Sequence, residues 1–210
     1  MEETSLTDRE IETVATYNVI ADEWASARNN PNFRLDELDI LKSYLPKKGS
    51  LLEVGVGGGR DVEFLTELCG QYTGIDVSAG LLAVARDNNP NANLAQANLY
   101  ALPFADDAFD VFWSAATLFH IPEDRIEQAL QSLHRVTKNK GIGFISIEEG
   151  VGEYMEEVEG KPGLRRLFVY YSFDKFEKIL NLCGYEIVSS TYRPLSKFTT
   201  YMSFVVRVIK

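Results

Sequence analysis

Residue types that usually form disulfides or hold metals are scarce in this chain. Its 210 residues include two cysteines and two histidines. Cys69 and Cys183 lie far apart, each in an apolar helical context, so their spacing indicates neither a disulfide framework nor a metal site. We therefore expect two buried thiols in a reducing compartment, and no metal.

Long apolar runs are missing too. No stretch approaches the roughly 20 consecutive apolar residues that cross a bilayer. The first four residues are acidic and lack the basic and apolar regions of a signal peptide. We expect a soluble cytoplasmic protein that acts away from membranes, as a monomer or homodimer.

Positive charge is in short supply, with 21 basic against 31 acidic residues and a net charge of −10. Nucleic-acid binding depends on Lys and Arg neutralising phosphates, and the densest basic stretch, residues 161–166, is sparse. A small-molecule substrate is therefore favoured over a nucleic acid. Hydrophobic residues make up 45% of the chain, which is enough for a single core without disulfides.

Strand-like and helix-like patterns alternate along most of the chain. Amphipathic helical patterns separate the first apolar runs, whereas a short connection joins the last two. Such a short connection forces neighbouring strands to be antiparallel. The pattern predicts a three-layer, doubly wound, Rossmann-like α/β sheet of seven strands, with the last strand antiparallel. The expected strands are residues 51–54, 72–77, 91–97, 109–114, 142–147, 186–191 and 201–209.

A glycine-rich loop, EVGVGGG, follows the first expected strand. Gly55 permits a tight turn, and Gly57 lets a ligand approach the backbone. The next helix offers free N–H groups to an anionic part of a ligand. Asp76 ends the second expected strand, where a carboxylate can accept hydrogen bonds from ribose hydroxyls.

Nicotinamide-dependent oxidoreductases carry a similar loop, G-x-G-x-x-G, at this place. Counted from Gly55, the sixth position here is Arg60. Its bulk opposes the close helix–strand packing that the third glycine of the dinucleotide motif provides. An oxidoreductase is thereby disfavoured but stays an alternative, as does a plain tight turn.

Four segments in order give the chain a family resemblance. LLEVGVGGGRD, YTGIDVSAGLLAVAR, ANLYALPFADDAFDVFWSAATLFHI and RVTKNKGIGFISI resemble the successive motifs of the class I S-adenosylmethionine-dependent methyltransferases, of the small-molecule, type 11-like kind. The resemblance covers about residues 50–149. It implies S-adenosylmethionine as cofactor, S-adenosylhomocysteine as product, and an enzyme that methylates a small acceptor. A non-catalytic S-adenosylmethionine-binding module that acts through a partner is the alternative.

The resemblance also implies a division of one domain, residues 1–210. Residues 1–48 are expected as an N-terminal helical lid and residues 49–149 as the cofactor-binding core. Residues 150–171 are expected as a substrate-side loop, and residues 172–210 as a C-terminal helix and strand pair.

Cofactor contacts are implied at several of the motif positions. Asp76 would hold the ribose hydroxyls, and the glycines would face the methionine and ribose portions. Asn98 stands where the family more often has Asp, and an amide oxygen can still accept a hydrogen bond. Arg60 would either reach the cofactor carboxylate or pair with an acid on the helix surface. The full expected set is Tyr17, Glu53, Gly55, Val56, Gly57, Arg60, Asp76, Val77, Asn98, Leu99, Ser114 and Ala115.

Tyr17 belongs to an N-terminal segment, TYNVIADEWASAR, that resembles the lid of small methyltransferases. An aromatic face near a sulfonium is physically favourable. Alternatively, Tyr17, Ile20 and Trp24 share a helical spacing and form a stripe of core residues. Both interpretations stay open here.

The acceptor side is less clearly specified, because S-adenosylmethionine brings its own activated methyl group and many acceptors need no general base. His120 follows the fourth expected strand and is a tentative catalytic residue: a base, an acceptor ligand, or a side chain packed on Pro122. Residues after the fifth strand are expected to recognise a polar or ionic molecule, unless they form a solvated charged loop. They are Glu148, Glu149, Tyr154, Arg165, Arg166, Tyr170 and Tyr171.

Overall fold

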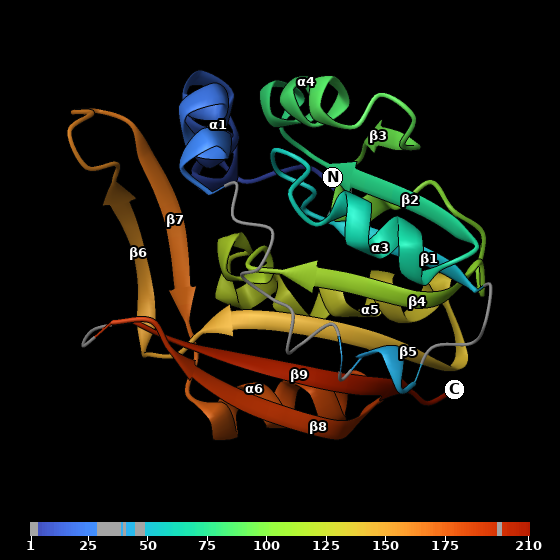
Figure 1. Ribbon diagram of the computed structural model, residues 1–210. Coiled ribbons are helices and arrows are strands. Elements are labelled where there is room, and N and C mark those ends of the chain that lie inside the picture. Colours follow the sequence, from blue (N-terminus) through green and yellow to red (C-terminus); the bar gives the residue numbers. More distant parts are fainter. Residues whose placement is uncertain (1–3, 29–38, 40, 45–48, 197–198) are drawn as a thin grey trace.

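The computed structural model describes residues 4–28, 39, 41–44, 49–196 and 199–210. Its main feature is a seven-stranded sheet with strand order β3-β2-β1-β4-β5-β9-β8 and helices on both faces (Figure 1). Six of the strands run in one direction, and β9 is antiparallel to both β5 and β8, as predicted. The strands are β1 (Ser50–Val54), β2 (Gln71–Asp76), β3 (Leu94–Gln96), β4 (Phe109–Ala115), β5 (Thr137–Glu148), β8 (Tyr185–Pro194) and β9 (Thr200–Val208).

The strand order reverses between β1 and β4. From β1 the chain winds outward through β2 to β3, then crosses back to β4 and winds the other way. The loops after β1 and β4 therefore leave in opposite directions, and a crevice opens at the carboxyl ends of these two strands. This reversal fixes where a ligand can enter the sheet.

The helices after the strands bury the faces that their periodicity predicts. They are α3 (Val62–Leu68), α4 (Ala79–Asn88), α5 (Ile126–Val136) and α6 (Phe173–Leu182), with short 3-10 turns η1 (Leu99–Ala101), η2 (Leu118–His120) and η3 (Glu123–Arg125). Ser78 caps α4 by accepting a hydrogen bond from the backbone of Leu81, and Ser172 caps α6 in the same way through Lys175.

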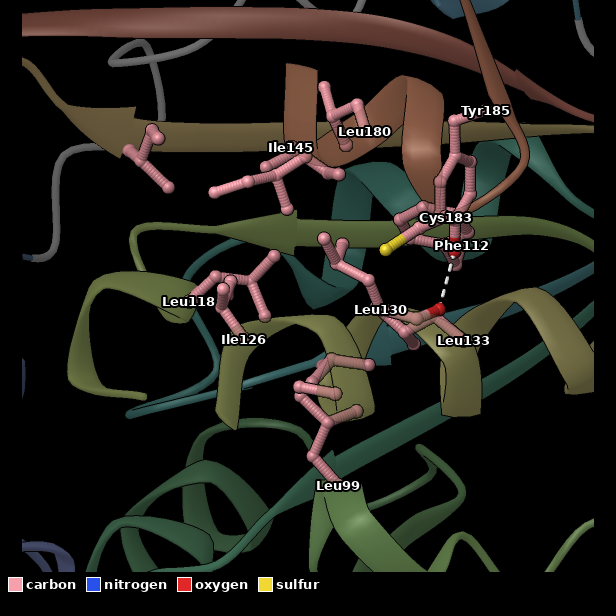
Figure 2. Close-up of a cluster of buried hydrophobic side chains, with 14 of the residues drawn as sticks. Leu99, Phe112, Leu118, Ile126, Leu130, Leu133, Ile145, Leu180, Cys183 and Tyr185 are labelled. Atoms are coloured by element: carbon pink, nitrogen blue, oxygen red, sulfur yellow. Dashed lines mark hydrogen bonds between the residues drawn. The ribbon is translucent and has the colours of Figure 1, made fainter. Parts of the chain in front are cut away.

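The larger apolar core lies between the sheet and helices α5 and α6. Figure 2 shows part of it, where Leu130 and Leu133 of α5 pack toward Phe112 of the sheet. Tyr185 reaches into this core and donates its hydroxyl to the carbonyl of Leu130 at 2.8 Å. That bond satisfies the one polar atom that the ring brings into an apolar region.

Residues 150–171 differ from the loop that we expected. They contain a second, two-stranded antiparallel sheet of β6 (Gly152–Glu157) and β7 (Arg165–Tyr170). Leu167, Phe168 and Val169 of β7 are all buried. This apolar run is short and lies among charged and glycine residues, so no clear strand periodicity marks it in the sequence.

Helix α1 (Asp8–Ala27) lies between the β6–β7 hairpin and α4 (Figure 1). A capping box of Thr7 and Glu10 begins it. Thr13 accepts a hydrogen bond from the backbone N–H of Leu167, and Thr16 donates to the carbonyl of Arg165, so α1 pairs with the edge of β7. Of the expected lid, residues 1–3, 29–38, 40 and 45–48 lie outside the described residues.

Across the described part of the chain, every helix is too short or too polar to span a membrane.

The core predicts a large stability difference between two leucine truncations. Leu133 is fully buried, so Leu133→Ala should lower the free energy of unfolding by about 2–5 kcal/mol through lost burial and a residual cavity. Leu182 ends α6 and is 76% exposed, so Leu182→Ala should change stability by less than about 0.5 kcal/mol. Denaturant titration of the two variants measures both values, and similar losses would contradict the assigned core.

Candidate active site

A cavity lies at the crevice predicted by the strand order, and α1 covers it. Its walls come from α1, the glycine loop after β1, the end of β2, the loop before η1, and η2. Eight of the expected site residues line it: Tyr17, Gly55, Gly57, Asp76, Val77, Asn98, Leu99 and His120. The fold therefore brings together residues that are up to about half the chain apart in sequence.

The glycine loop needs glycine for two separate reasons. Gly55 and Gly57 have φ angles of +78° and +58°, in the left-handed region that side chains disfavour. A Cβ on Gly55 would also overlap the side chain of Thr117, and one on Gly57 would lie 3.0 Å from the Trp24 ring. The loop thus packs directly beneath η2 and α1, with no space for larger residues.

Asp76 joins this loop to the start of α4. Its carboxylate accepts hydrogen bonds from the backbone N–H groups of Gly57 and Ser78, each at 2.9 Å. The side chain is 9% exposed, and burial raises its pKa although these backbone hydrogen bonds oppose the rise. One carboxylate therefore fixes two backbone segments and still borders the cavity.

Asn98 holds the N-terminal segment against the opposite end of the cavity. Its amide nitrogen donates to the carbonyl of Thr4 at 2.8 Å, and its amide oxygen accepts from the backbone of Tyr100 at 3.0 Å. An aspartate has no donor for the Thr4 carbonyl. This contact gives a physical reason for the departure from the family's usual Asp.

Tyr17, His120 and Arg166 form a hydrogen-bonded chain at the cavity wall. His120 Nδ1 lies 2.5 Å from the Leu167 carbonyl, which can only accept, so Nδ1 carries the proton. Nε2 is then an acceptor, and the Tyr17 hydroxyl donates to it at 2.8 Å. Arg166 Nη1 in turn donates to the Tyr17 oxygen at 3.2 Å.

His120 is a neutral imidazole in this arrangement. Burial, followed by the positive charge of Arg166, lowers its pKa to about 3, although the hydrogen bond to Leu167 opposes the change. A group with so low a pKa is a weak general base at neutral pH. The geometry thus favours His120 as the partner that orients the Tyr17 hydroxyl.

Two expected cofactor residues lie behind the loop instead of along the cavity. Glu53 is buried and accepts a hydrogen bond from the Tyr72 hydroxyl. Burial, with the nearby carboxylate of Asp61, raises the Glu53 pKa to about 8. Arg60 holds Asp61 through Nε and Nη2 at 2.6 and 2.9 Å, which is the ion pair that we considered as one alternative.

The other expected cofactor residues outside the lining are in or beside the strands. Val56 is buried in the smaller core, and Ser114 and Ala115 belong to β4. Next to them, Ala116 and Thr117 line the cavity. Ala116 has a φ of +59°, so the chain turns sharply there, although alanine is not a residue type that signals such a turn.

None of the seven expected substrate-side residues is among the described residues that line the cavity. Arg166 comes nearest through Tyr17, whereas Arg165 forms an ion pair with Glu12. Glu149 and Tyr154 are exposed, and Tyr171 is buried. Tyr170 donates to Glu156 at 2.6 Å, and burial, with the charge of Glu156, raises the pKa of Glu148.

Glu10 is a cavity residue that we did not expect. It is 4% exposed and accepts hydrogen bonds from the Tyr100 hydroxyl at 2.6 Å and from Arg125 at 3.3 Å. The T-x-x-E spacing of Thr7 and Glu10 signals a capping box in the sequence. Its link to Tyr100 depends on tertiary packing and has no such signal.

Comparisons with known proteins agree with this geometry. Residues 52–145 match the family model described as a methyltransferase domain. The malonyl-[acyl-carrier protein] O-methyltransferase of Pseudescherichia vulneris is 30% identical over 115 residues, covering 53% of this chain and 45% of that protein. The demethylmenaquinone methyltransferase of Chlorobaculum parvum is 28% identical over 151 residues, covering 71% and 58%. The chain thus spans about half the length of the curated relatives it matches.

Solved structures show the same fold. Burkholderia thailandensis 1,6-didemethyltoxoflavin-N1-methyltransferase, with bound 1,6-didemethyltoxoflavin and S-adenosylhomocysteine, aligns with a TM-score of 0.77 at 18% identity, over 100% of this chain and 94% of that one. Residues 52–145 are thus similar in sequence to methyltransferase domains, and the chain has the fold of a solved methyltransferase that holds S-adenosylhomocysteine. The resemblance carried by the four sequence motifs is confirmed.

The loop geometry predicts that Gly55→Ala impairs cofactor binding. The alanine adopts a strained left-handed conformation and overlaps Thr117, so the loop must shift. We expect the affinity for S-adenosylhomocysteine, measured by calorimetry, to fall at least about tenfold. Gly160→Ala is the matched control, because Gly160 also has a positive φ, of +72°, but its Cβ would meet nothing within 4 Å. Equal affinities in the two variants would contradict the proposed loop contact.

His120 predicts a loss of stability on acidification. Its pKa is about 3 when folded against an ordinary value of 6.5, so below pH 6.5 the unfolded chain binds a proton that the folded chain does not. The contribution of His120 to the free energy of unfolding is fully present above pH 6.5. It falls as the pH drops toward 3, by at most about 1.4 kcal/mol per pH unit. Denaturant titrations at several pH values between about 4 and 7 give the free energy of unfolding at each pH. This free energy should fall less steeply with decreasing pH for His120→Gln than for the unmodified chain. Parallel slopes would show that His120 is not held neutral.

Proposed function

We propose that the protein binds S-adenosylmethionine in this cavity and transfers its methyl group to a small-molecule acceptor. The observation that carries the proposal is the position of Asp76. Its buried carboxylate borders the cavity at the end of β2, beside a loop whose glycines leave no room for a Cβ. A carboxylate at this place suits ribose hydroxyls, and a bare backbone suits a closely packed ligand.

The donor groups of the cavity also fit such a cofactor. Leu99 and Val77 provide apolar surface near Asn98, where the adenine would lie, and Gly55 and Gly57 provide backbone at the other end. Trp24 borders the same end, and its buried indole N–H has no hydrogen-bond partner among the described residues. A bound ligand can satisfy that donor.

In the proposed reaction, the protein chiefly positions groups and excludes water. S-adenosylmethionine supplies a methyl group that is already activated on a sulfonium. Asp76 holds the ribose, and α1 closes the cavity through its bonds to β7. Tyr17 presents its hydroxyl at the cavity wall, with His120 and Arg166 fixing its direction. Orientation of this kind lowers the barrier for an in-line displacement.

The acceptor does not follow from the relatives. By their names, they act on a malonyl-acyl carrier protein, on demethylmenaquinone and on 1,6-didemethyltoxoflavin, which are unlike one another. Since a shared fold does not fix a substrate, we propose only a small molecule. We further propose a cytosolic location, because Cys69 and Cys183 are both free thiols, as expected in a reducing compartment.

Asp76→Ala tests the cofactor assignment. We expect S-adenosylhomocysteine to bind at least about tenfold more weakly, because ribose hydroxyls lose a charged acceptor and the loop loses its bond through Gly57. Asp76→Asn keeps an acceptor oxygen and should lose less. Asp87→Ala, on the exposed side of α4, is the control and should bind normally. Unchanged affinity in Asp76→Ala would overturn the placement of the ribose.

Turnover of S-adenosylmethionine carrying a labelled methyl group, against a panel of metabolites, tests the chemistry. Transfer of label to one panel member supports the enzyme. Tight binding of S-adenosylhomocysteine without any transfer favours the binding module. Binding of NADH in its place would favour the oxidoreductase.

A further inference from the structure

Arg166 lies beside the cavity with an incomplete set of partners. It belongs to β7, on the same face as Phe168 and Tyr170, and its guanidinium lies over the rings of Tyr17 and Phe168 at 5.4 and 5.1 Å. Within the described part of the chain, its hydrogen bond is the one from Nη1 to Tyr17. Its Nε is buried and has no hydrogen-bond partner there.

Two other arginines in the protein show what the Nε–Nη2 edge of a guanidinium binds. Arg60 uses Nε and Nη2 to hold Asp61 at 2.6 and 2.9 Å. Arg165, the neighbour of Arg166, uses the same two nitrogens to hold Glu12 at 2.7 and 3.0 Å. The parallel N–H groups of this edge match the two oxygens of a carboxylate. Arg166 offers the same edge, without a carboxylate from the described residues.

The nearest acid by strand register is already engaged elsewhere. Glu156 of β6 is directly opposite Arg166, but its Oε1 accepts the Tyr170 hydroxyl at 2.6 Å. No ion pair joins Glu156 to Arg166 in the described structure. Arg166 is half-buried, and its buried Nε–H lacks a partner among the described residues. An unpaired buried donor is costly, so an anion that accepts from it gains more than it would at an exposed arginine.

Aromatic rings surround the position. Phe168 stacks on Phe119 with centroids 5.3 Å apart and on Tyr170 at 6.1 Å, and it meets His120 edge to face at 4.9 Å. Flat ring surfaces of this kind suit a planar ligand. Because Arg166 belongs to the hairpin, outside the seven-stranded sheet, it lies on the far side of Tyr17 from the glycine loop.

From these contacts we infer that the acceptor is a planar aromatic molecule with a carboxylate, and that Arg166 binds this carboxylate through its Nε–Nη2 edge. Phe168 and its ring neighbours hold the aromatic part. This inference rests on the proposed function, since it names the acceptor class for the same site. The cofactor also carries a carboxylate, so the test must separate the two sources.

The experiment uses the full chain loaded with S-adenosylhomocysteine and three matched pairs of probes. The pairs are benzoate with benzamide, 2-naphthoate with 2-naphthamide, and indole-3-carboxylate with indole-3-carboxamide. By calorimetry, at least one acid should bind at least about tenfold more tightly than its amide, because only the acid offers two anionic oxygens. If no acid is favoured over its amide, or none binds, the inference is wrong.

Variants then locate the effect. Arg166→Gln should remove the preference for acid over amide, and Arg166→Lys, which keeps the charge but not the planar edge, should retain only part of it. Arg207→Gln removes an arginine that pairs with Glu186 on the surface, and it should keep the full preference. A preserved preference in Arg166→Gln overturns the inference. If Arg166→Gln does not fold, Arg166→Lys decides: a reduced preference for acid over amide supports the inference, and an unchanged preference overturns it.

Binding of two cofactor analogues distinguishes the acceptor carboxylate from the cofactor carboxylate, and it also tests the proposed function separately. S-adenosylhomocysteine carries the methionine carboxylate, whereas 5′-methylthioadenosine does not. Because Arg166 also orients Tyr17, Arg166→Gln can weaken both compounds, but if Arg166 binds the acceptor, the ratio of the two affinities should stay that of the unmodified chain. A selective loss for S-adenosylhomocysteine would assign Arg166 to the cofactor and overturn the inference. Failure of the unmodified chain to bind either compound would instead refute the proposed function.

Discussion

The site depends on one buried carboxylate that accepts two backbone hydrogen bonds. Asp76 connects the glycine loop at Gly57 with the start of α4 at Ser78. Burial alone would favour its neutral form, which its raised pKa shows, and the two N–H donors compensate for part of that cost. Since the same group borders the cavity, a ligand that supplies further donors finds a carboxylate already oriented. The strand order places this carboxylate at the crevice, so the fold and the site share one constraint.

Helix α1 turns that open crevice into a cavity, and polar contacts at both of its ends hold it in place. Near its start, Glu10 accepts from Tyr100, and Asn98 donates to the segment before the helix. Farther along, Thr13 and Thr16 bond to the edge of β7. These bonds use backbone groups of an edge strand that would otherwise be unpaired. Helix α1 is thus tied to β7 on one side and to Asn98 and Tyr100 at the cavity on the other.

The sequence predicts local features well where one residue type is needed for a local reason. Gly55 and Gly57 need positive φ angles, Ser78 and Ser172 cap helices, and the short connection before β9 makes that strand antiparallel. Such requirements act over a few residues, so a pattern in the chain can reveal them. Matches to the family motifs then extend these local signals to the order of the strands.

Contacts between distant segments are harder to predict. The hairpin of β6 and β7 was missed because only three consecutive residues of β7 are buried and neither strand shows a clear alternation. Ser114 and Ala115 were chosen in place of Thr117 because the sharp turn at Ala116, a non-glycine residue with positive φ, leaves no mark in the sequence. The family resemblance implies cofactor contacts for Glu53 and Arg60, with an ion pair as the alternative for Arg60. In the structure Glu53 accepts a hydrogen bond from Tyr72, and Arg60 pairs with Asp61. In each case tertiary packing decides the direction of a side chain.

The chain Arg166–Tyr17–His120 shows how these distant segments define the chemistry of the acceptor end. His120 stays neutral beside Arg166, because burial and the positive charge of Arg166 lower its pKa to about 3. The guanidinium is therefore the cation of this trio, in a protein whose net charge is −10. A cation that an acidic chain places among aromatic rings, and leaves without a described acidic partner, needs an anion from elsewhere. The hairpin that supplies it lies outside segment 52–145, so this cation is separate from the part of the chain that resembles methyltransferase domains.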